Sequence, residues 1–208
     1  MAKIGFLGGT FNPIHNGHLM LANYAYEQLS LEKVLIVPSG ISYLKSRDSV
    51  LEKSIRAEMV KLAIEEYPYF EFSDIEINRE GNTYTFETLF ELNKVYTNDS
   101  IYFICGADTV FSIESWKNPN IVLANCSLAV MVRDDSDIED ISRQCKYLNK
   151  KYDTHTEILN APKVDISSTT IRNMINDGCY ESTRELLPLG VYNYIIENRL
   201  YFKGNIDT

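Results

Sequence analysis

Hydrophobic and polar residues along the chain follow two different periods, which predict strands in some segments and helices in others. A short run of consecutive apolar residues predicts a buried strand, because a strand covered on both faces has no side that needs polar side chains. Such runs occupy residues 3–7, 34–37, 101–105 and 128–132, and residues 70–77 alternate between apolar and polar.

Apolar residues spaced three and four apart lie between these runs and predict helices. The helical segments begin at Leu19, cover residues 55–63 and 86–92, resume at 166–176 and end with 187–200. Strands that alternate with helices are typical of an α/β fold whose mostly parallel sheet is covered by helices on both faces. We therefore expect one doubly wound domain over residues 1–208, with a small C-terminal helical part at about 166–208.

The composition, 45% hydrophobic and 24% charged, is that of an ordinary globular protein. The net charge of −9 disfavours a nucleic acid as a partner, because binding to its backbone requires a basic surface. A small phosphorylated substrate needs only local positive groups, so the acidic total leaves that class of ligand open. The acidic residues 134–140 are expected to form a solvated loop that leads into a surface helix.

The four cysteines are scattered, without the paired spacing of a zinc site or a redox motif. Neither a secretory leader nor an apolar run of about twenty residues is evident. We therefore expect a cytoplasmic protein with reduced thiols and no membrane partner. The oligomeric state stays open, a homo-oligomer included.

The first strand leads into a glycine-rich turn and then into a helix, over the sequence GGTFNPIHNGH of residues 8–18. Unpaired backbone N–H groups and the helix dipole converge at such a turn and favour an anion. Gly8 and Gly9 let a phosphate approach the main chain, because they carry no Cβ. His15 and His18 lie three apart at the helix entrance, with Gly17 leaving room between them. A metal pair on the helix, or histidines that cap the turn, are the alternatives.

Two other phosphate-binding motifs do not fit this turn. The glycines do not have the GxGxxG spacing of a redox dinucleotide site, and no GxxxxGK motif followed by serine or threonine is present.

A second anion site is predicted near the C-terminus, in the sequence ISSTTIR of residues 166–172. Hydroxyl residues at a helix start supply N-caps and leave backbone N–H groups for a phosphate. The apolar residues of this helix face the core, so Arg172 can point outward and bind phosphate oxygens with its guanidinium fork. A generic capped helix is the alternative for this element alone. Two such sites at strand-to-helix turns together favour a polyphosphate ligand.

Further polar residues follow the predicted strands, at the sheet edge where ligands of such folds bind. Lys45 could reach a phosphate, although on physical grounds alone it fits a solvated surface lysine better. After Gly106, Asp108 could accept hydrogen bonds from ribose hydroxyls, or could equally be a helix N-cap. Arg133 ends its strand at the same edge.

Aromatic residues could line a pocket at this edge. Tyr84 and Thr85 could contact a substrate, or could simply start the following helix. Trp116, the only tryptophan, could stack on a flat heteroaromatic ring or fill the core.

The string GGTFNPIHNGHL, with its HxGH motif, resembles the phosphate-binding signature of the nucleotidyltransferase superfamily and of its nicotinate mononucleotide adenylyltransferase family in particular. The later ISSTTIR is similar to the ISSTxIR motif of that family. The intervening pieces agree with it too, namely VPSG with Lys45, Arg56 with Met59, DIEINREGNTYTFETL, FICGAD, Trp116 and LPLGVYNYI. One departure is plain: the family usually has Pro-Pro-His-Lys where this chain has Ser42-Tyr43-Leu44-Lys45.

The resemblance implies a Rossmann-like nucleotidyltransferase fold and an adenylyl transfer from ATP to nicotinate mononucleotide. The products would be deamido-NAD and pyrophosphate, and Mg²⁺ would be bound mainly through the ATP phosphates and water. Two alternatives remain: an adenylyl- or cytidylyltransferase for another phosphorylated acceptor, and a nucleotide-binding regulator without turnover.

The resemblance also implies roles for individual residues. His15 and His18 would contact the ATP phosphates together with Arg172, and His18 would stabilise the α-phosphoryl group as it is transferred. The other ATP contacts would come from Gly8, Gly9, Thr10, Phe11, Lys45, Gly106, Asp108, Ile166, Ser167, Ser168 and Thr169. The nicotinate pocket would be formed by Tyr84, Thr85 and Trp116, with Arg133 near the phosphate of the acceptor. No protein side chains would form a dedicated metal site.

Overall fold

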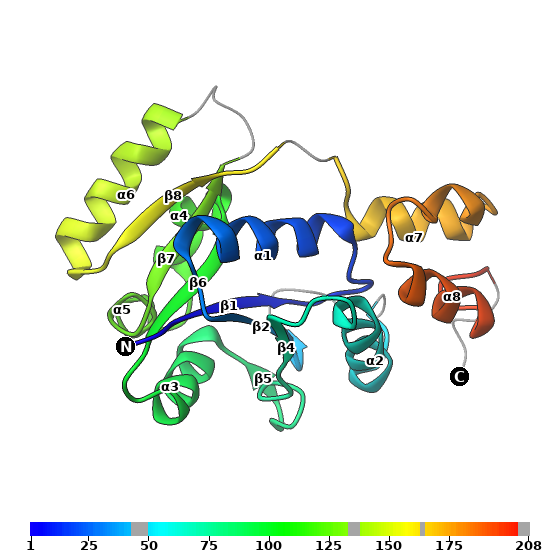
Figure 1. Cartoon of the computed structure of the whole chain (residues 1–208), viewed down its shortest axis with the longest axis horizontal. Helices are drawn as coiled ribbons and strands as arrows, with labels where there is room; N and C mark the ends of the chain where they lie inside the picture. Colours follow the sequence, from blue (N-terminus) through cyan, green and yellow to red (C-terminus); the bar gives the residue numbers. More distant parts are fainter. Residues whose placement is uncertain (43–49, 133–137, 163–164, 204–208) are drawn as a thin grey trace.

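A computed structural model of the chain describes residues 1–42, 50–132, 138–162 and 165–203. Six strands of this part form one parallel sheet in the order β4-β2-β1-β6-β7-β8 (Figure 1). Two short strands form a separate parallel pair, β3-β5. The strands are β1 (Lys3–Gly9), β2 (Lys33–Pro38), β3 (Ile41–Ser42), β4 (Phe70–Phe72), β5 (Asn82–Thr83), β6 (Ser100–Gly106), β7 (Ser127–Val132) and β8 (Thr156–Asn160).

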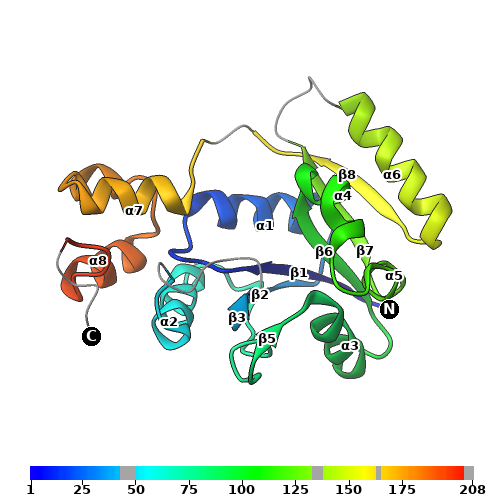
Figure 2. The ribbon, with the colours of Figure 1, turned by 180° about the vertical axis from the view of Figure 1, so that it is seen from behind.

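Helices cover both faces of the sheet, so the doubly wound, parallel architecture expected from the sequence is confirmed (Figure 2). On one face lie α1 (Asn16–Leu29) and α2 (Lys53–Ile64). Helix α7 (Ser168–Asn176), the short 3₁₀ helix η4 (Tyr180–Thr183) and α8 (Leu189–Glu197) join the same core beyond the carboxyl end of β1 (Figure 1). On the other face lie α3 (Thr85–Val95), α4 (Ala107–Ser112), the 3₁₀ helix η2 (Ile113–Ser115), α5 (Pro119–Ala124) and α6 (Ile138–Tyr152).

Successive residues of each central strand serve two separate cores. In β2, Val34 and Ile36 pack with α1 and α2, whereas Leu35 and Val37 pack with α3 and α4. Both faces of the strand are therefore apolar, which is why its sequence is a continuous hydrophobic run. The C-terminal helices α7 and α8 share the first core with α1 and α2. The division of the chain into one domain with a C-terminal helical part stays a prediction.

The structure departs from the sequence pattern in three elements. The strand expected over 70–77 ends at Phe72, and the main chain then turns, with Asn78 N donating to Asp74 O at 3.0 Å. The sequence pattern does not indicate strand β8, because its polar residues Thr156, Glu157 and Asn160 leave only two consecutive apolar residues. Helices α4 and α5, of six residues each, are too short to show a helical period.

Strand order reverses between β1 and β6, since the chain adds β2 and β4 on one side of β1 and β7 and β8 beyond β6. At such a reversal the connections leave on opposite faces and open a crevice beyond the carboxyl ends of the two strands. The β1–α1 loop and the start of α4 both lie at this edge. The topology therefore places the first glycine-rich turn at the ligand-binding edge of the sheet.

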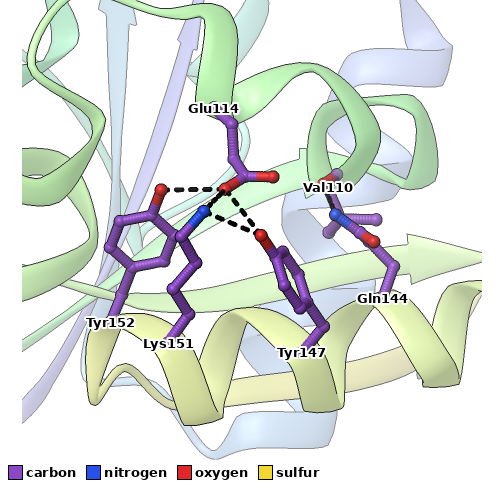
Figure 3. A network of polar contacts seen from close by, with 6 residues as sticks. All are labelled: Val110, Glu114, Gln144, Tyr147, Lys151 and Tyr152. Carbon is purple, nitrogen blue, oxygen red and sulfur yellow. Dashed lines mark hydrogen bonds and ion pairs between the residues drawn. The ribbon is translucent and has the colours of Figure 1, made fainter.

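Helix α6 is held to the second face by a polar network (Figure 3). Glu114 Oε1 accepts from Lys151 Nζ at 2.7 Å, from Tyr152 OH at 2.8 Å and from Tyr147 OH at 3.2 Å. The hydrogen bond from Lys151 lowers the pKa of Glu114. Since α6 starts at Ile138, the surface helix expected after the acidic stretch is present, while 134–137 lie outside the described residues.

Over the described residues, none of the helices combines the length and the apolar character needed to cross a membrane. All four cysteines are free thiols, namely Cys105, Cys126, Cys145 and Cys179.

Candidate active site

The segment between β1 and α1, residues 10–15, is called the phosphate loop below. Its Phe11 has a left-handed backbone, with φ of 48°, and the ring turns back over the end of β1. A Cβ at Gly9 would lie 2.8 Å from this ring, so the absence of a side chain at Gly9 is what admits Phe11. The Phe11 ring then meets the His18 ring edge-on, with centroids 5.0 Å apart.

His15 and His18 stand together at the start of α1. Their rings stack with centroids 3.6 Å apart, and a Cβ at Gly17 would come within 3.1 Å of His15 Nδ1. His15 is buried, 5% exposed, whereas His18 is half-buried. Nδ1 of His18 accepts a hydrogen bond from the backbone N of His15 at 3.2 Å. The proton of the neutral His18 ring is therefore on Nε2, which becomes a donor.

The start of α7 lies directly beside the phosphate loop (Figure 1). Ser167 caps α7 by accepting from Thr170 N at 3.1 Å, and Ser168 Oγ donates to Pro13 O at 2.9 Å. Arg172 Nη1 donates to Asn12 O at 2.9 Å. The two segments that the sequence places about 150 residues apart thus lie side by side, and two helix N-termini meet there.

The side chain of Arg172 does not simply extend into solvent. Besides Asn12 O, it contacts Thr169, with Nη2 donating to Oγ1 at 3.2 Å. These contacts use two of the five N–H groups of the guanidinium and fix its plane against the phosphate loop. Ile166, another residue of the ISSTTIR motif, lies next to Gly17. A Cβ added to Gly17 would be 3.7 Å from the Cβ of Ile166.

Gly106 and Asp108 lie where β6 becomes α4. The N-cap of α4 is Gly106, so Asp108 is in the first turn of the helix and is not its cap. A Cβ at Gly106 would be 2.6 Å from Asp108 Oδ1, and the glycine therefore makes room for this exposed carboxylate at the sheet edge.

Tyr84 and Thr85 start helix α3, with Tyr84 as the extended N-cap residue. This turn is fixed by the buried Glu76, whose Oε1 accepts from Thr88 Oγ1 at 2.7 Å. Burial raises the pKa of Glu76, and hydrogen bonds from Thr88, Thr83 and the backbone of Gly40 oppose that rise. Glu76 thereby ties the loop after β2 to the start of α3.

Trp116 follows η2 and is half-buried on the face covered by α3 to α6. Its ring meets Phe103 of β6 edge-on, with centroids 6.0 Å apart. Both alternatives considered for Trp116 fit this position, because one side of the ring packs on the core while part of it stays exposed.

Comparison with known proteins identifies the relatives of this chain. The Cytidylyltransferase-like family matches residues 6–174. A protein of Lachnoclostridium phytofermentans, called a probable nicotinate-nucleotide adenylyltransferase, is 41% identical over 97% of this chain and 100% of its own length. A protein of Clostridium tetani with the same name is 39% identical over the same shares of the two chains.

The chain belongs to the nicotinate-nucleotide adenylyltransferase family. The resemblance inferred from the two motifs is thereby confirmed. Its fold matches the nicotinic acid mononucleotide adenylyltransferase of Plasmodium falciparum, solved in complex with APC and with NaAD. The TM-scores are 0.77 and 0.79 at 21% and 22% identity, over 97% of this chain and 98% of the other.

Two residues that the resemblance to this family assigns to the site, Lys45 and Arg133, lie outside the described residues, as does most of the Ser42–Lys45 departure. Within the ranges that are described, no group of three or more metal-binding side chains comes together. The phosphate loop and the starts of α1 and α7 offer imidazole, guanidinium and backbone N–H groups, which suit phosphate oxygens better than Mg²⁺. These residues therefore fit a magnesium ion carried by a nucleotide.

Arg56 has a structural role that its sequence pattern alone does not reveal. It lies in α2, is only 2% exposed, and donates to four main-chain oxygens. The acceptors are Thr10 O at 2.7 Å, Ser39 O at 2.7 Å, Leu51 O at 3.0 Å and Gly40 O at 3.1 Å. Arg56 therefore joins the phosphate loop to the loop after β2.

A signal for Arg56 was present in the sequence. Arg56 shares the buried stripe of α2 with Met59, Val60 and Ala63, at the spacing i, i+3, i+4 and i+7. A charged residue inside an apolar stripe is almost never buried without partners, so it indicates a built polar site.

Proposed function

We propose that this protein transfers the adenylyl group of ATP to nicotinate mononucleotide, giving deamido-NAD and pyrophosphate. The meeting of two helix N-termini, the His15–His18 pair and Arg172 at one loop is the observation that carries the proposal. The names of the relatives support nicotinate mononucleotide as the acceptor. We place the protein in the cytoplasm, the location expected from the scattered spacing of its four cysteines.

In this reaction an oxygen of the acceptor's 5′-phosphate attacks the α-phosphorus of ATP in line. The new P–O bond forms as the bond to pyrophosphate breaks, so no protein nucleophile is needed. Catalysis then depends on positioning and on stabilising the charge of the transferring group. We assign Nε2–H of His18 to the α-phosphoryl oxygens, because the hydrogen bond at Nδ1 fixes the ring with Nε2 as donor.

The α7 start would hold the β- and γ-phosphates with Ser167, Thr169 and Arg172, and Lys45 would assist. Gly106 and Asp108 would contact the ribose of the adenosine. Mg²⁺, bound mainly to phosphate oxygens and water, would neutralise charge on the triphosphate.

Replacing Arg172 with alanine is expected to weaken ATP binding by roughly tenfold or more, because a charge-assisted contact to phosphate is lost. The effect should appear in the KM for ATP, measured by pyrophosphate release at saturating acceptor. Arg143→Ala is the control, since Arg143 is 78% exposed on α6 and pairs only with Asp140 among the described residues. An unchanged KM for ATP in Arg172→Ala would remove this residue from the site.

The acceptor pocket is expected to prefer the acid, nicotinate mononucleotide, over the amide. Tyr84 and Thr85 open α3, where backbone N–H groups and the helix dipole favour a carboxylate. An amide would leave one donor unmatched, at a cost of about 1–3 kcal/mol, or one to two orders of magnitude in kcat/KM.

Trp116→Ala tests the pocket further. Stacking on the ring acts equally on acid and amide, so this variant should raise KM for both acceptors by similar factors and keep the acid-to-amide ratio. The measurement is kcat/KM for both mononucleotides in wild type and variant. Equal use of the amide by wild type, or loss of the preference in Trp116→Ala, would contradict this assignment.

The overall proposal is tested by pyrophosphate release with ATP or CTP and a panel of phosphorylated acceptors. We expect turnover with ATP and nicotinate mononucleotide above all other pairs. Faster turnover with a different acceptor, or with CTP, would identify another nucleotidyl transfer. ATP binding without turnover of any acceptor would indicate a nucleotide-binding regulator.

A further inference from the structure

The chain after α8 turns back onto the phosphate loop. Arg199 and Tyr201 both have left-handed backbones, with φ of 49° and 68°, which non-glycine residues adopt rarely. This turn brings the Tyr201 hydroxyl to the side chain of Asn12, where it donates to Oδ1 at 2.9 Å across 189 residues of sequence.

Asn12 is the point at which three distant segments hold the phosphate loop. Its side chain is buried, 4% exposed, and Oδ1 accepts a second hydrogen bond from Leu51 N at 3.2 Å. Both lone pairs of this oxygen are therefore engaged. The main-chain oxygen of Asn12 accepts from Arg172, so the loop is fixed by side chain and main chain together.

The surroundings keep Tyr201 a neutral donor. Burial raises its pKa, while the nearby guanidinium groups of Arg172 and Arg56 oppose the rise. The hydroxyl is therefore protonated at neutral pH, and it links the C-terminal segment to the loop as a hydrogen-bond donor.

We propose that Tyr201 is a positioning residue of the active site, whose hydroxyl fixes Asn12 and thereby sets the phosphate loop for ATP. Tyr201 acts through Asn12 and needs no contact with the nucleotide. The inference rests on the proposed function in one respect, that ATP phosphates bind at this loop.

The test replaces Tyr201 with phenylalanine, which removes only the hydroxyl. We expect kcat/KM for ATP to fall about tenfold and the Kd for ATP, measured without acceptor, to rise by a similar factor, because the loop loses its fixed position. Inhibition by adenosine should change less than twofold, since adenosine carries no phosphate to meet the loop.

Tyr69→Phe is a matched control. Tyr69 OH also donates to an asparagine, Asn23 Oδ1, at 2.6 Å, but Asn23 lies within α1, away from the phosphate loop. Both variants lose one tyrosine–asparagine hydrogen bond, so their free energies of unfolding should fall by similar amounts. Only Tyr201→Phe should lose ATP affinity.

A second variant, Asn12→Ala, tests the Tyr201–Asn12 contact independently. Asn12→Ala should weaken the binding of ATP but not that of adenosine. Adding Tyr201→Phe to Asn12→Ala should raise the Kd for ATP by less than a further twofold, because the shared hydrogen bond is already gone. The inference would be overturned if the effects of Asn12→Ala and Tyr201→Phe on the Kd for ATP were additive. It would also be overturned if Tyr201→Phe bound ATP as tightly as the wild type, or if Tyr69→Phe lost as much ATP affinity as Tyr201→Phe. If the wild-type protein binds ATP but does not transfer its adenylyl group to nicotinate mononucleotide, the proposed reaction is rejected. The comparison of Kd values for ATP among the variants stays valid in that case.

Discussion

The substitution His18→Ala is expected to lower kcat by roughly two to three orders of magnitude, the usual effect of losing one stabiliser of transition-state charge. The ring is placed for this role by the hydrogen bond from His15 N to its Nδ1, by stacking on His15 and by edge contact with Phe11. Such a donor acts mainly while charge develops, so KM for ATP should change much less than kcat. Steady-state pyrophosphate release with ATP and nicotinate mononucleotide measures both.

The third histidine supplies the control for this experiment. His155 is exposed just before β8, at the edge of the sheet opposite to the site, where its Nε2 lies 2.8 Å from Glu157 Oε1. His155→Ala should keep kcat within about twofold. His18→Gln keeps an N–H donor and should recover part of the lost rate. Near wild-type turnover in His18→Ala would remove this ring from the chemistry.

Arg56→Met is expected to cost about 3–5 kcal/mol in the free energy of unfolding, the largest stability loss among the changes considered. The reason is geometric: one guanidinium satisfies four main-chain oxygens at distances of 2.7–3.1 Å, and methionine leaves all four without this donor. Urea unfolding at neutral pH measures the loss. Because Thr10 O is one of the four, the folded fraction should also bind ATP more weakly.

Arg56→Lys separates charge from shape. Lysine keeps the positive charge but has one ammonium in place of the planar fork, so it cannot reach oxygens from three loops together. We expect most of the stability loss to remain in this variant, whereas Arg143→Met on the surface of α6 should change stability by less than about 0.5 kcal/mol. Full stability of Arg56→Lys would show that charge alone is sufficient at this position.

The fold class and the two helix starts of the candidate site could be predicted from the sequence because each depends on local physics. Continuous apolar runs indicate strands buried on both faces, and glycine or hydroxyl residues at a helix start indicate exposed N–H groups. Residues 8–18 and 166–172 are therefore visible without any knowledge of the rest of the chain. The family resemblance rests mainly on these two local motifs, and shorter strings elsewhere in the chain agree with it.

The sequence could not show how the site is assembled, because assembly depends on contacts between distant segments. Only the tertiary structure places α7 against the phosphate loop, buries Arg56 among four carbonyl oxygens, and brings Tyr201 to Asn12. Hydrogen bonds of this kind leave no period in the sequence, since a buried polar residue is specified by partners far along the chain. Local sequence thus determined which segments expose N–H groups at a helix start, and tertiary packing decided that these segments lie side by side.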